Sequence, residues 1–311
     1  MKHLVLSAAL LLSACNTVEP LPTADTQIAI EAMRVLSDDA MMGRAAMTDG
    51  AAMAQAYITE RVSDLNDGVA PTEHAFTRTV TRRSGETRDI RGTNLITTLP
   101  GRTADGPILE ITAHFDHLGM TETGDVYNGA DDNASGVGAL LAILASFRDA
   151  PPTHEVRLIW LDAEEMGLSG AREYVRTEID DRPRLNLNLD MIAQNDEGVI
   201  YGSGTYHTPA LAPFVKQAAA GTGLSVRLGH DRPEDGPNDW TSQSDHAAWH
   251  AAGIPFLYFG VEDHPHYHRP SDTFETIPLD TYEMTVQLAV NTAHLLDDNL
   301  AELAKARSTE P

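Results

Sequence analysis

The stretch Ile108–Gly136, which begins ILEITAHFDHLG and ends YNGADDNASG, decides the fold. Its first residues form an apolar run with β-branched members, which predicts a buried strand ending at His114, Asp116 and His117. The turn from Asn128 is rich in Gly, Ala, Asp and Ser, and an apolar helical pattern follows it. Ionisable side chains at the carboxyl end of a strand that leads into a helix indicate a ligand site of a wound α/β sheet.

The same alternation of strand and helix patterns continues along the chain. Helical spacing covers residues 26–36 and 49–65, and residues 74–99 alternate like a hairpin with a turn at Ser84-Gly85. Further strand-like runs cover 154–163, 184–190, 198–201, 224–228 and 254–259, and further helical patterns cover 167–175, 209–220 and 279–296. We expect an α/β fold, a three-layer sandwich with a mixed, mostly parallel central sheet flanked by helices.

Length and composition are those of one large globular domain. The chain has 311 residues, 42% of them hydrophobic, which is enough for a substantial core. Its formal net charge is −24 at pH 7. This charge argues against nucleic acid as a partner, because phosphate binding needs a basic face and the sequence shows none.

The N-terminus resembles a bacterial lipoprotein signal. A charged start precedes an apolar segment, Leu4 to Leu12, that is too short to span a bilayer, and Leu-Ser-Ala-Cys closes it at Cys15. The resemblance implies a signal peptide at 1–14, a lipid anchor on Cys15, a tether at 15–25 and a catalytic domain at 26–305. Asn16 favours the outer membrane, facing the periplasm, and we expect no transmembrane span in the mature chain. The alternative is an ordinary cleaved signal in which Cys15 is incidental.

Four separate strand-like runs end in side chains of metal-ligand type. They lead to His114 and Asp116, to Glu164 and Glu165, to Asp190, and to the histidines after Phe259. Parallel packing would bring these ends to one edge of the sheet, where so many carboxylates would repel each other without cations. Carboxylates and imidazoles without thiolates suit zinc, or else manganese or cobalt, and the excess of acids suggests two ions with a shared ligand.

The motifs at these strand ends resemble those of the di-zinc aminopeptidases of clan MH, a group that also contains glutamate carboxypeptidases and glutaminyl cyclases. The segments that match in order and spacing are AHFDH, GADDNASG, AEE, NLDM, SDHAAW and HYHRPSDT. The match runs from about His114 to Thr273, so it covers most of the expected catalytic domain, and the N-terminal helices carry little of it.

The resemblance implies a role for each matching residue. The implied metal ligands are His114, Asp132, Glu165, Asp190 and His268, and Asp132, three residues before Ser135, is shared by both ions. The peptide bond after Asp132 is expected to be cis, and Asp116 is expected to orient the imidazole of His114. Glu164 matches the general base, and Tyr267 matches a tyrosine that in some members hydrogen-bonds the oxyanion.

The implied function is that of a zinc metallopeptidase. A metal-bridging hydroxide would attack the carbonyl with Glu164 as general base, and the most favoured activity is removal of N-terminal residues from short peptides. A carboxypeptidase or dipeptidase of the same fold and a glutaminyl cyclase with one zinc are alternatives. A non-catalytic binding protein is a third, against which the complete ligand set argues.

The remaining polar residues near the motifs are expected to be structural. We expect His117 to form a structural hydrogen bond, and His264 and His266 to be loop histidines. Ser244 and Asp245 are expected to cap a short helix.

Overall fold

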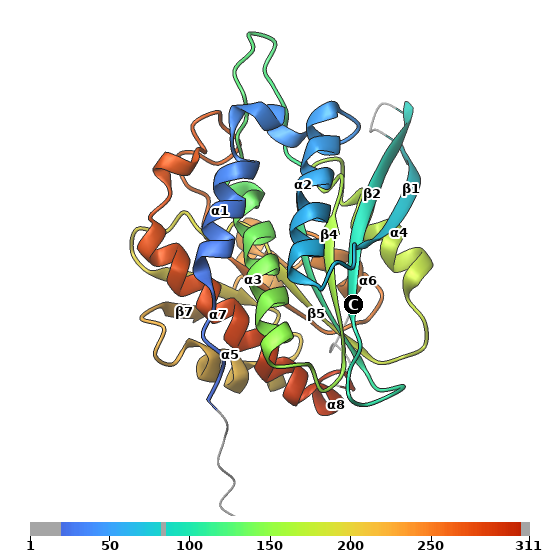
Figure 1. The fold of residues 1–311 in the computed structure, drawn as a ribbon, viewed down its shortest axis with the longest axis vertical. Helices are drawn as coiled ribbons and strands as arrows, with labels where there is room; N and C mark the ends of the chain where they lie inside the picture. The colour runs from blue at the N-terminus through green and yellow to red at the C-terminus, as the bar shows by residue number, and fades with distance from the viewer. Residues whose placement is uncertain (1–19, 82–84, 306–311) are drawn as a thin grey trace, which may run out of the picture.

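The computed structural model describes residues 20–81 and 85–305 and contains one mixed sheet in the order β1-β2-β4-β3-β5-β8-β6-β7 (Figure 1). The strands are β1 Thr72–Thr81, β2 Thr87–Leu99, β3 Ile108–His114, β4 Glu155–Leu161, β5 Arg184–Leu189, β6 Val199–Ser203, β7 Ser225–Leu228 and β8 Phe256–Gly260. The pairs β4–β3, β3–β5, β5–β8 and β6–β7 are parallel, and β1–β2, β2–β4 and β6–β8 are antiparallel. The expected α/β class and the mixed, mostly parallel sheet are confirmed.

Helices cover both faces of this sheet and make it the middle of three layers. The α-helices are α1 Thr26–Leu36, α2 Asp49–Leu65, α3 Gly136–Asp149, α4 Ser169–Glu178, α5 Ala212–Ala219, α6 His246–Ala251, α7 Leu279–Asp298 and α8 Leu300–Leu303. One layer contains α1, α2, α3, α5 and α7, and α4 and α6 pack together behind the sheet (Figure 1). Short 3-10 helices lie at Asp39–Arg44, Pro209–Leu211, Pro233–Asn238 and Phe274–Thr276, and a π-helical turn lies at Ala130–Ser135.

The central strands β3 and β5 are buried along their whole length, as expected for strands with helices on both faces. Side chains alternate between the two faces of a strand, and the odd-numbered positions of both strands join the large core under α1, α3 and α7. The even-numbered positions carry polar groups toward α4 and α6. There Glu110 of β3 contacts Arg184, with 2.6 Å between carboxylate and guanidinium, and accepts hydrogen bonds from Tyr174 and Trp249.

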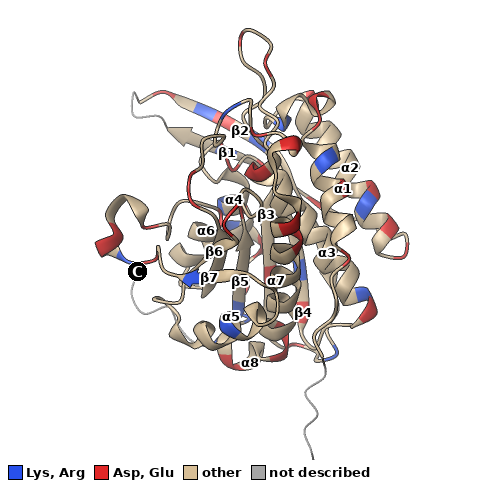
Figure 2. Cartoon of the chain, turned by 90° about the vertical axis from the view of Figure 1, so that its left-hand side faces the viewer, with Lys and Arg blue, Asp and Glu red and all other residues tan. Residues whose placement is uncertain are grey.

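The parallel strands β4, β3, β5 and β8 are neighbours, so their carboxyl ends meet at one edge of the sheet. Each strand leads there into a loop that carries candidate ligands. Figure 2 shows acidic residues spread over helices and loops on several sides of the molecule, in keeping with the net charge of −24. Among residues 20–81 and 85–305, no helix combines the length and apolar character needed to cross a bilayer.

At the N-terminus the structure differs from a free tether. The signal peptide, Cys15 and the residues up to 19 lie outside the described residues, as does Ser84 of the expected turn. The end of the expected 15–25 tether is docked on α7, because the Ala24 N–H donates to Gln287 Oε1 and Gln287 Nε2 donates to the Pro22 carbonyl. Residues 20–25 are therefore part of the folded domain.

Candidate metal centre

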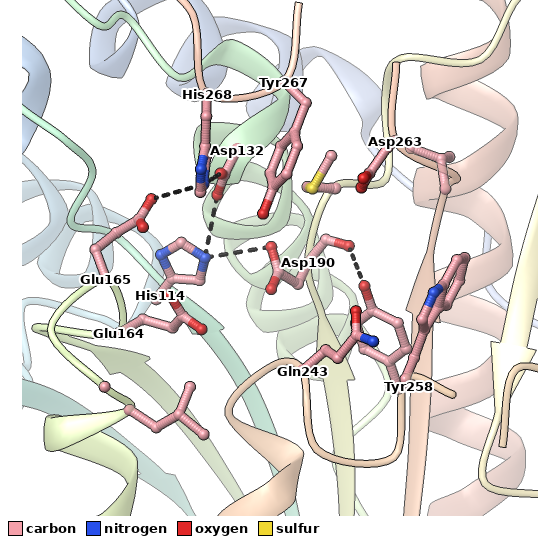
Figure 3. Close-up of a pocket in the computed structure, with 15 residues that line it drawn as sticks. His114, Asp132, Glu164, Glu165, Asp190, Gln243, Tyr258, Asp263, Tyr267 and His268 are labelled. Atoms are coloured by element: carbon pink, nitrogen blue, oxygen red, sulfur yellow. Dashed lines mark hydrogen bonds and ion pairs between the residues drawn. The ribbon is translucent and has the colours of Figure 1, made fainter. Parts of the chain in front are cut away.

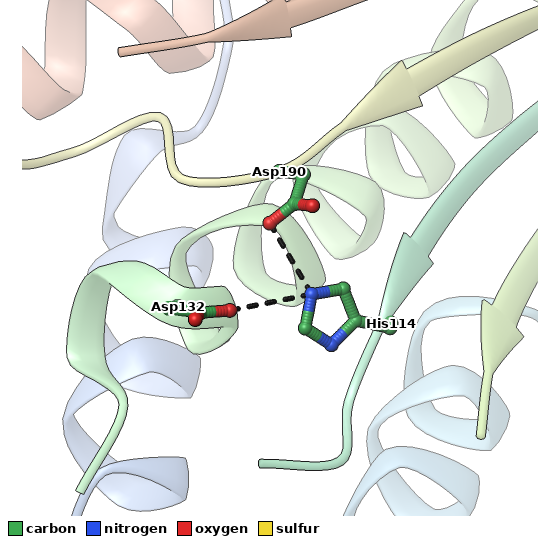
Figure 4. Close-up of side chains that lie close together, drawn as sticks. All are labelled: His114, Asp132 and Asp190. Carbon is green, nitrogen blue, oxygen red and sulfur yellow. Dashed lines mark hydrogen bonds and ion pairs between the residues drawn. The ribbon is translucent and has the colours of Figure 1, made fainter. Parts of the chain in front are cut away.

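His114 and Asp190 face each other because the pleat of two paired strands places them on one side of the sheet. Thr112 of β3 pairs with Asn188 of β5, and two residues further on the same face come His114 and Asp190. Nε2 of His114 lies 3.2 Å from Oδ1 of Asp190 (Figure 4). The imidazole is 1% exposed, so both strands deliver ligand-type groups to a nearly dry position.

Asp132 turns one oxygen toward each of two groups of side chains. Its Oδ1 lies 3.3 Å from Nε2 of His114 (Figure 4), and its Oδ2 lies 3.2 Å from Nε2 of His268. The Asp131 and Asp132 N–H groups donate to the buried carboxylate of Asp272, which fixes the loop before α3. The Asp132–Asn133 peptide bond is cis, so that expectation is confirmed.

Glu165, His117 and His268 gather around the second oxygen of Asp132. Oε1 of Glu165 lies 2.8 Å from Nδ1 of His117 and 3.5 Å from Nε2 of His268. His117 thus forms a hydrogen bond, as expected, and its partner is Glu165. With Asp132 and Glu165 it also forms a group that could hold a metal ion. The signal for it in the sequence was its spacing from His114, which puts His117 in the loop three residues after the end of β3.

The pKa values of these groups reflect crowding of opposite charges. Burial alone would lower the pKa of His114, but Asp190 and the other carboxylates raise it well above its usual value. Hydrogen bonds to Asp132 and Glu165 raise the pKa of His268 to about 10. Burial alone would raise the pKa of Asp132, but the neighbouring imidazoles, His117 first, lower it well below its usual range. The ionised carboxylates thus stabilise positive charge at this edge of the sheet. Protons on the imidazoles or bound metal ions can provide that charge.

Asp116 supports the centre with both its backbone and its side chain. Nδ1 of His114 lies 3.1 Å from the Asp116 main-chain carbonyl oxygen, whereas the Asp116 carboxylate is 3.7 Å away. That carboxylate accepts hydrogen bonds from the N–H groups of Glu164, at 2.9 Å, and Glu165, at 3.3 Å. Asp116 therefore orients His114 with its backbone and holds the glutamate pair with its side chain.

Glu164 lines the same cavity beside the metal-binding groups (Figure 3). Burial raises the pKa of its carboxyl well above the ordinary value, and the negative charges of Asp245, Asp190 and Glu165 add to this effect. A carboxyl with a raised pKa can both accept and return a proton near neutral pH, which is the property that a general acid and base needs.

Arg44 is a residue of the centre that sequence reasoning missed. Its guanidinium is fully buried and donates to four carbonyl oxygens, those of Leu36, Phe115, Asn128 and Gly129, at 2.5 to 2.9 Å. Two of these carbonyls belong to the loop before Asp132, and Phe115 follows His114. The sequence offered no local signal, because the function of Arg44 depends on contacts 71 to 85 residues away.

Ser244 and Asp245 do not cap α6 as expected. No side-chain cap hydrogen bond forms at this helix, because the Ser244 hydroxyl donates instead to Oδ2 of Asp190 at 2.6 Å. The Asp245 carboxylate is fully buried, and neither of its oxygens has a hydrogen-bond partner among the described residues. Burial raises its pKa to about 8. His246 does pack the helix start, with Nε2 at 2.9 Å from the Trp240 carbonyl oxygen.

The loop after β8 supplies Tyr267 and His268, whose rings stack with centroids 3.9 Å apart. The Tyr267 hydroxyl points into the cavity on the side of Asp190 (Figure 3). His264 lies 3.2 Å from Asp131, and His266 lies 3.0 Å from the Ser271 hydroxyl, so both occupy the loop positions expected of them.

All eight residues selected from the sequence meet at this edge of the sheet. Seven of them line or border one cavity of about 260 Å³, and Asp116 lies directly behind it. Within the described residues, two groups could hold a metal ion, His114–Asp132–Asp190 and His117–Asp132–Glu165, and they share Asp132. Oxygen and imidazole donors without sulfur fit zinc and similar divalent ions.

Comparison with known proteins agrees with this geometry. The profile of peptidase family M28 matches residues 94–293, which is more than half of the chain. The chain therefore belongs to peptidase family M28, and the resemblance seen in its motifs is confirmed.

Several relatives are named as aminopeptidases. Aminopeptidase YwaD of Bacillus subtilis is 28% identical over 187 residues, which cover 55% of this chain and 37% of the relative. The probable lipoprotein aminopeptidase LpqL of Mycobacterium tuberculosis is 26% identical over 230 residues, covering 64% of this chain and 44% of the relative. The matched segments thus span less than half the length of these relatives.

Solved structures share the fold over nearly the whole chain. A zinc aminopeptidase of Bacillus subtilis, BSAP, superposes with a TM-score of 0.69 at 18% identity, covering 94% of this chain and 99% of that one. A glutaminyl cyclase of Bacteroides thetaiotaomicron gives a TM-score of 0.69 at 17% identity, covering 88% and 99%. At such identities the likeness is one of fold.

Proposed function

We propose that the chain is a zinc-dependent aminopeptidase that removes N-terminal residues from short peptides. The observation that carries the proposal is the carboxylate of Asp132, which turns one oxygen toward His114 and Asp190 and the other toward Glu165 and His268. A carboxylate in that position can be shared by two divalent ions. The names of YwaD and LpqL as aminopeptidases and of BSAP as a zinc enzyme support the same activity.

The proposed ligands of the two ions are His114 and Asp190 for one, Glu165 and His268 for the other, and Asp132 for both. His117 is a further candidate donor of the second position. These residues fit zinc because several carboxylates and imidazoles lie buried together, and so many buried negative charges need cations beside them. The guanidinium of Arg44 lies behind them. The bound ions would supply Lewis acidity toward water and toward the scissile carbonyl.

The chain's own side chains supply the proton transfers. Glu164 is placed to take a proton from the attacking water and to return it to the departing amine. Its raised pKa favours the first of these steps, because a carboxylate whose protonated form is stabilised takes a proton more readily. The Tyr267 hydroxyl is placed to donate a hydrogen bond to the oxygen that gains negative charge.

The size of the cavity suits the terminal residue of a peptide substrate better than an internal segment. Its volume of about 260 Å³ falls below the ~300–1,000 Å³ of pockets for drug-sized ligands, which suits one amino-acid side chain. The cluster of carboxylates beside it can hold a free α-amine. We therefore assign the cavity to the N-terminal residue of a peptide.

A test would compare leucine 4-nitroanilide with its N-acetylated form, using purified protein loaded with zinc. We expect hydrolysis of the free amine only, loss of activity with a chelator, and recovery on adding zinc. Glu164→Gln should lower kcat by about 10²- to 10⁴-fold, the usual share of a general base, while zinc content stays unchanged. Glu60→Gln, at an exposed position of α2, is the matched control.

Three outcomes would contradict the proposal. Hydrolysis of N-acetylated peptides from the carboxyl end would indicate a carboxypeptidase. Release of ammonia from N-terminal glutamine with one zinc per chain would indicate a glutaminyl cyclase. An unchanged kcat in Glu164→Gln would remove the assigned base.

For the N-terminal region, we propose that residues 1–14 are a signal peptide and that Cys15 carries a lipid anchor to the cell envelope. The catalytic domain, expected at 26–305, then also includes the docked residues 20–25. The lipoprotein name of LpqL supports this proposal. Metabolic labelling with radioactive palmitate tests it: the wild-type chain should be labelled and Cys15→Ala should not. Label on the variant would disprove the assignment.

A further inference from the structure

One wall of the cavity carries no metal-binding or catalytic group. It is formed by Met191, Trp240, Gln243, Tyr258, Val261 and Asp263. Met191, Trp240, Tyr258 and Val261 are buried, whereas Gln243 and Asp263 are exposed at the mouth. In Figure 3 this wall lies across the cavity from Glu165 and His268. It is therefore the surface that an N-terminal side chain would meet once its backbone lay against the metal-binding edge.

The aromatic part of this wall is held in place before any substrate arrives. The Trp240 indole stacks on His230 with ring centroids 3.9 Å apart and an angle of 9° between the planes. The Tyr258 hydroxyl donates to the Asp190 carbonyl at 3.2 Å. These contacts make the sides of the wall a preformed apolar slot, which suits the methylene stem of a long side chain.

Gln243 presents a hydrogen-bond acceptor to the cavity. Its Nε2 donates to the carbonyl oxygens of Pro237 and Asp239, each at 2.9 Å. Because both partners accept, the amide orientation is fixed and Oε1 remains as the group that faces the cavity, as Figure 3 shows. An acceptor at this place favours a side chain that ends in N–H donors.

Asp263 adds a negative charge at the same mouth. Its carboxylate forms no ion pair or side-chain hydrogen bond with any residue that the structure describes. It also borders a second hollow, which contains the carboxylates of Asp196, Glu197 and Glu262. Arg227 is the arginine among the residues of that hollow. The approach to the cavity is thus acidic, and a cationic side chain would meet a favourable potential there.

From this wall we infer that the enzyme selects peptides with a basic N-terminal residue, arginine or lysine. The inference rests on the proposed aminopeptidase function. The methylenes of the substrate side chain pack against Met191 and Val261, and its charged end meets Asp263 and Oε1 of Gln243. A charge-assisted hydrogen bond is about twice as strong as a neutral one, so these two groups discriminate against apolar residues of equal length.

The test measures kcat/KM of the zinc-loaded full chain with the 4-nitroanilides of arginine, lysine, leucine, methionine and glutamate. Arginine and lysine should exceed leucine and methionine by about tenfold, the worth of one charge-assisted hydrogen bond, and glutamate should be the poorest. Asp263→Asn should lower the ratio of arginine to leucine about fivefold or more. Glu60→Gln, which removes an equal charge from an exposed position of α2 outside both hollows, should leave that ratio within twofold.

The outcomes separate failure of this inference from failure of the proposed function. Leucine hydrolysed as well as arginine by the wild type would overturn the selectivity while keeping the aminopeptidase. An equal loss of kcat/KM for all substrates in Asp263→Asn would also overturn the selectivity. That result would indicate that the Asp263 carboxylate binds the α-amine of every substrate. No hydrolysis of any anilide at full zinc loading would instead remove the proposed function itself.

Discussion

Arg44 connects the segment after His114 with the loop before Asp132, two segments that carry proposed metal ligands. Five donors of one guanidinium can serve several acceptors at once, and here they bind the carbonyls after His114 and before Asp132. Burial lowers the pKa of Arg44 to about 10, so it stays charged at neutral pH. A lysine could satisfy fewer carbonyls and could not span them in one plane.

Arg44→Lys should therefore destabilise the protein and weaken zinc binding. Leaving buried carbonyls unpaired costs about 1–3 kcal/mol each, so we expect a loss of at least about 2 kcal/mol in the free energy of unfolding. Urea denaturation measures this loss. Arg34→Lys, at an exposed position of α1, is the control and should change stability by less than about 0.5 kcal/mol. Equal stability of the two variants would show that Arg44 does not organise the loops.

Some site residues could be predicted from the sequence because local patterns or motifs specify their positions. The others were missed because only tertiary contacts specify theirs. His114 and Asp190 follow from strand periodicity, and Asp132, Glu165 and His268 follow from motif order. The hydrogen bond from Ser244 to Asp190 could not be predicted in this way, because the residues around Ser244 have the pattern of a helix cap. Arg44 lay in a segment with no motif, and only the folded chain brings it to the site.

At the scale of elements, a buried carboxyl directly follows β4, two residues before Glu164. Asp162 is 1% exposed and its Oδ2 accepts from the Thr93 N–H at 3.0 Å, whereas its Oδ1 has no hydrogen-bond partner among the described residues. Burial, with a smaller contribution from Asp116, raises the pKa of Asp162 to about 7. The folded state therefore binds a proton that the unfolded chain releases at a lower pH.

This raised pKa predicts a pH-dependent cost to stability. Below the unfolded pKa of 3.8 both states are protonated and no cost arises, and the cost grows as pH rises and is complete above about 7. At its full size it is about 4 kcal/mol. Asp162→Asn removes the titration, so its stability relative to wild type should increase by roughly 2–3 kcal/mol between about pH 5 and about pH 8.

Urea unfolding of both proteins at the two pH values measures this difference. Asp105→Asn, at an exposed position, provides the control and should show no such dependence. A constant difference between Asp162→Asn and wild type at both pH values would mean that Asp162 ionises normally in the folded state.

Elements with strong periodic patterns were predictable, and those defined by tertiary contacts were not. The bounds Thr26–Leu36 and Asp49–Leu65 agree with the helical spacing, since each helix buries one apolar stripe. The strand order could not be derived from the sequence, because β3 lies between β4 and β5 and β8 lies between β5 and β6. The cavity wall from Trp240 to Gln243 was equally hidden, because its shape depends on ring stacking with His230.

At the scale of the whole molecule, the centre joins segments from across the chain. The loops after β3, β4, β5 and β8 and the turn before α3 all converge at one edge of the sheet. Asp132 lies at the middle of this convergence, with His114 on one side and His268 on the other. The proposed chemistry requires this carboxylate to hold two ions together.

Zinc content measured by mass spectrometry, for the wild-type chain and for Asp132→Asn after equal dialysis, tests this claim most directly. We expect two zinc ions per wild-type chain and clearly fewer than two in the folded variant, with peptidase activity lost together with the metal. Two tightly bound ions in both proteins, or at most one in an active wild type, would contradict it.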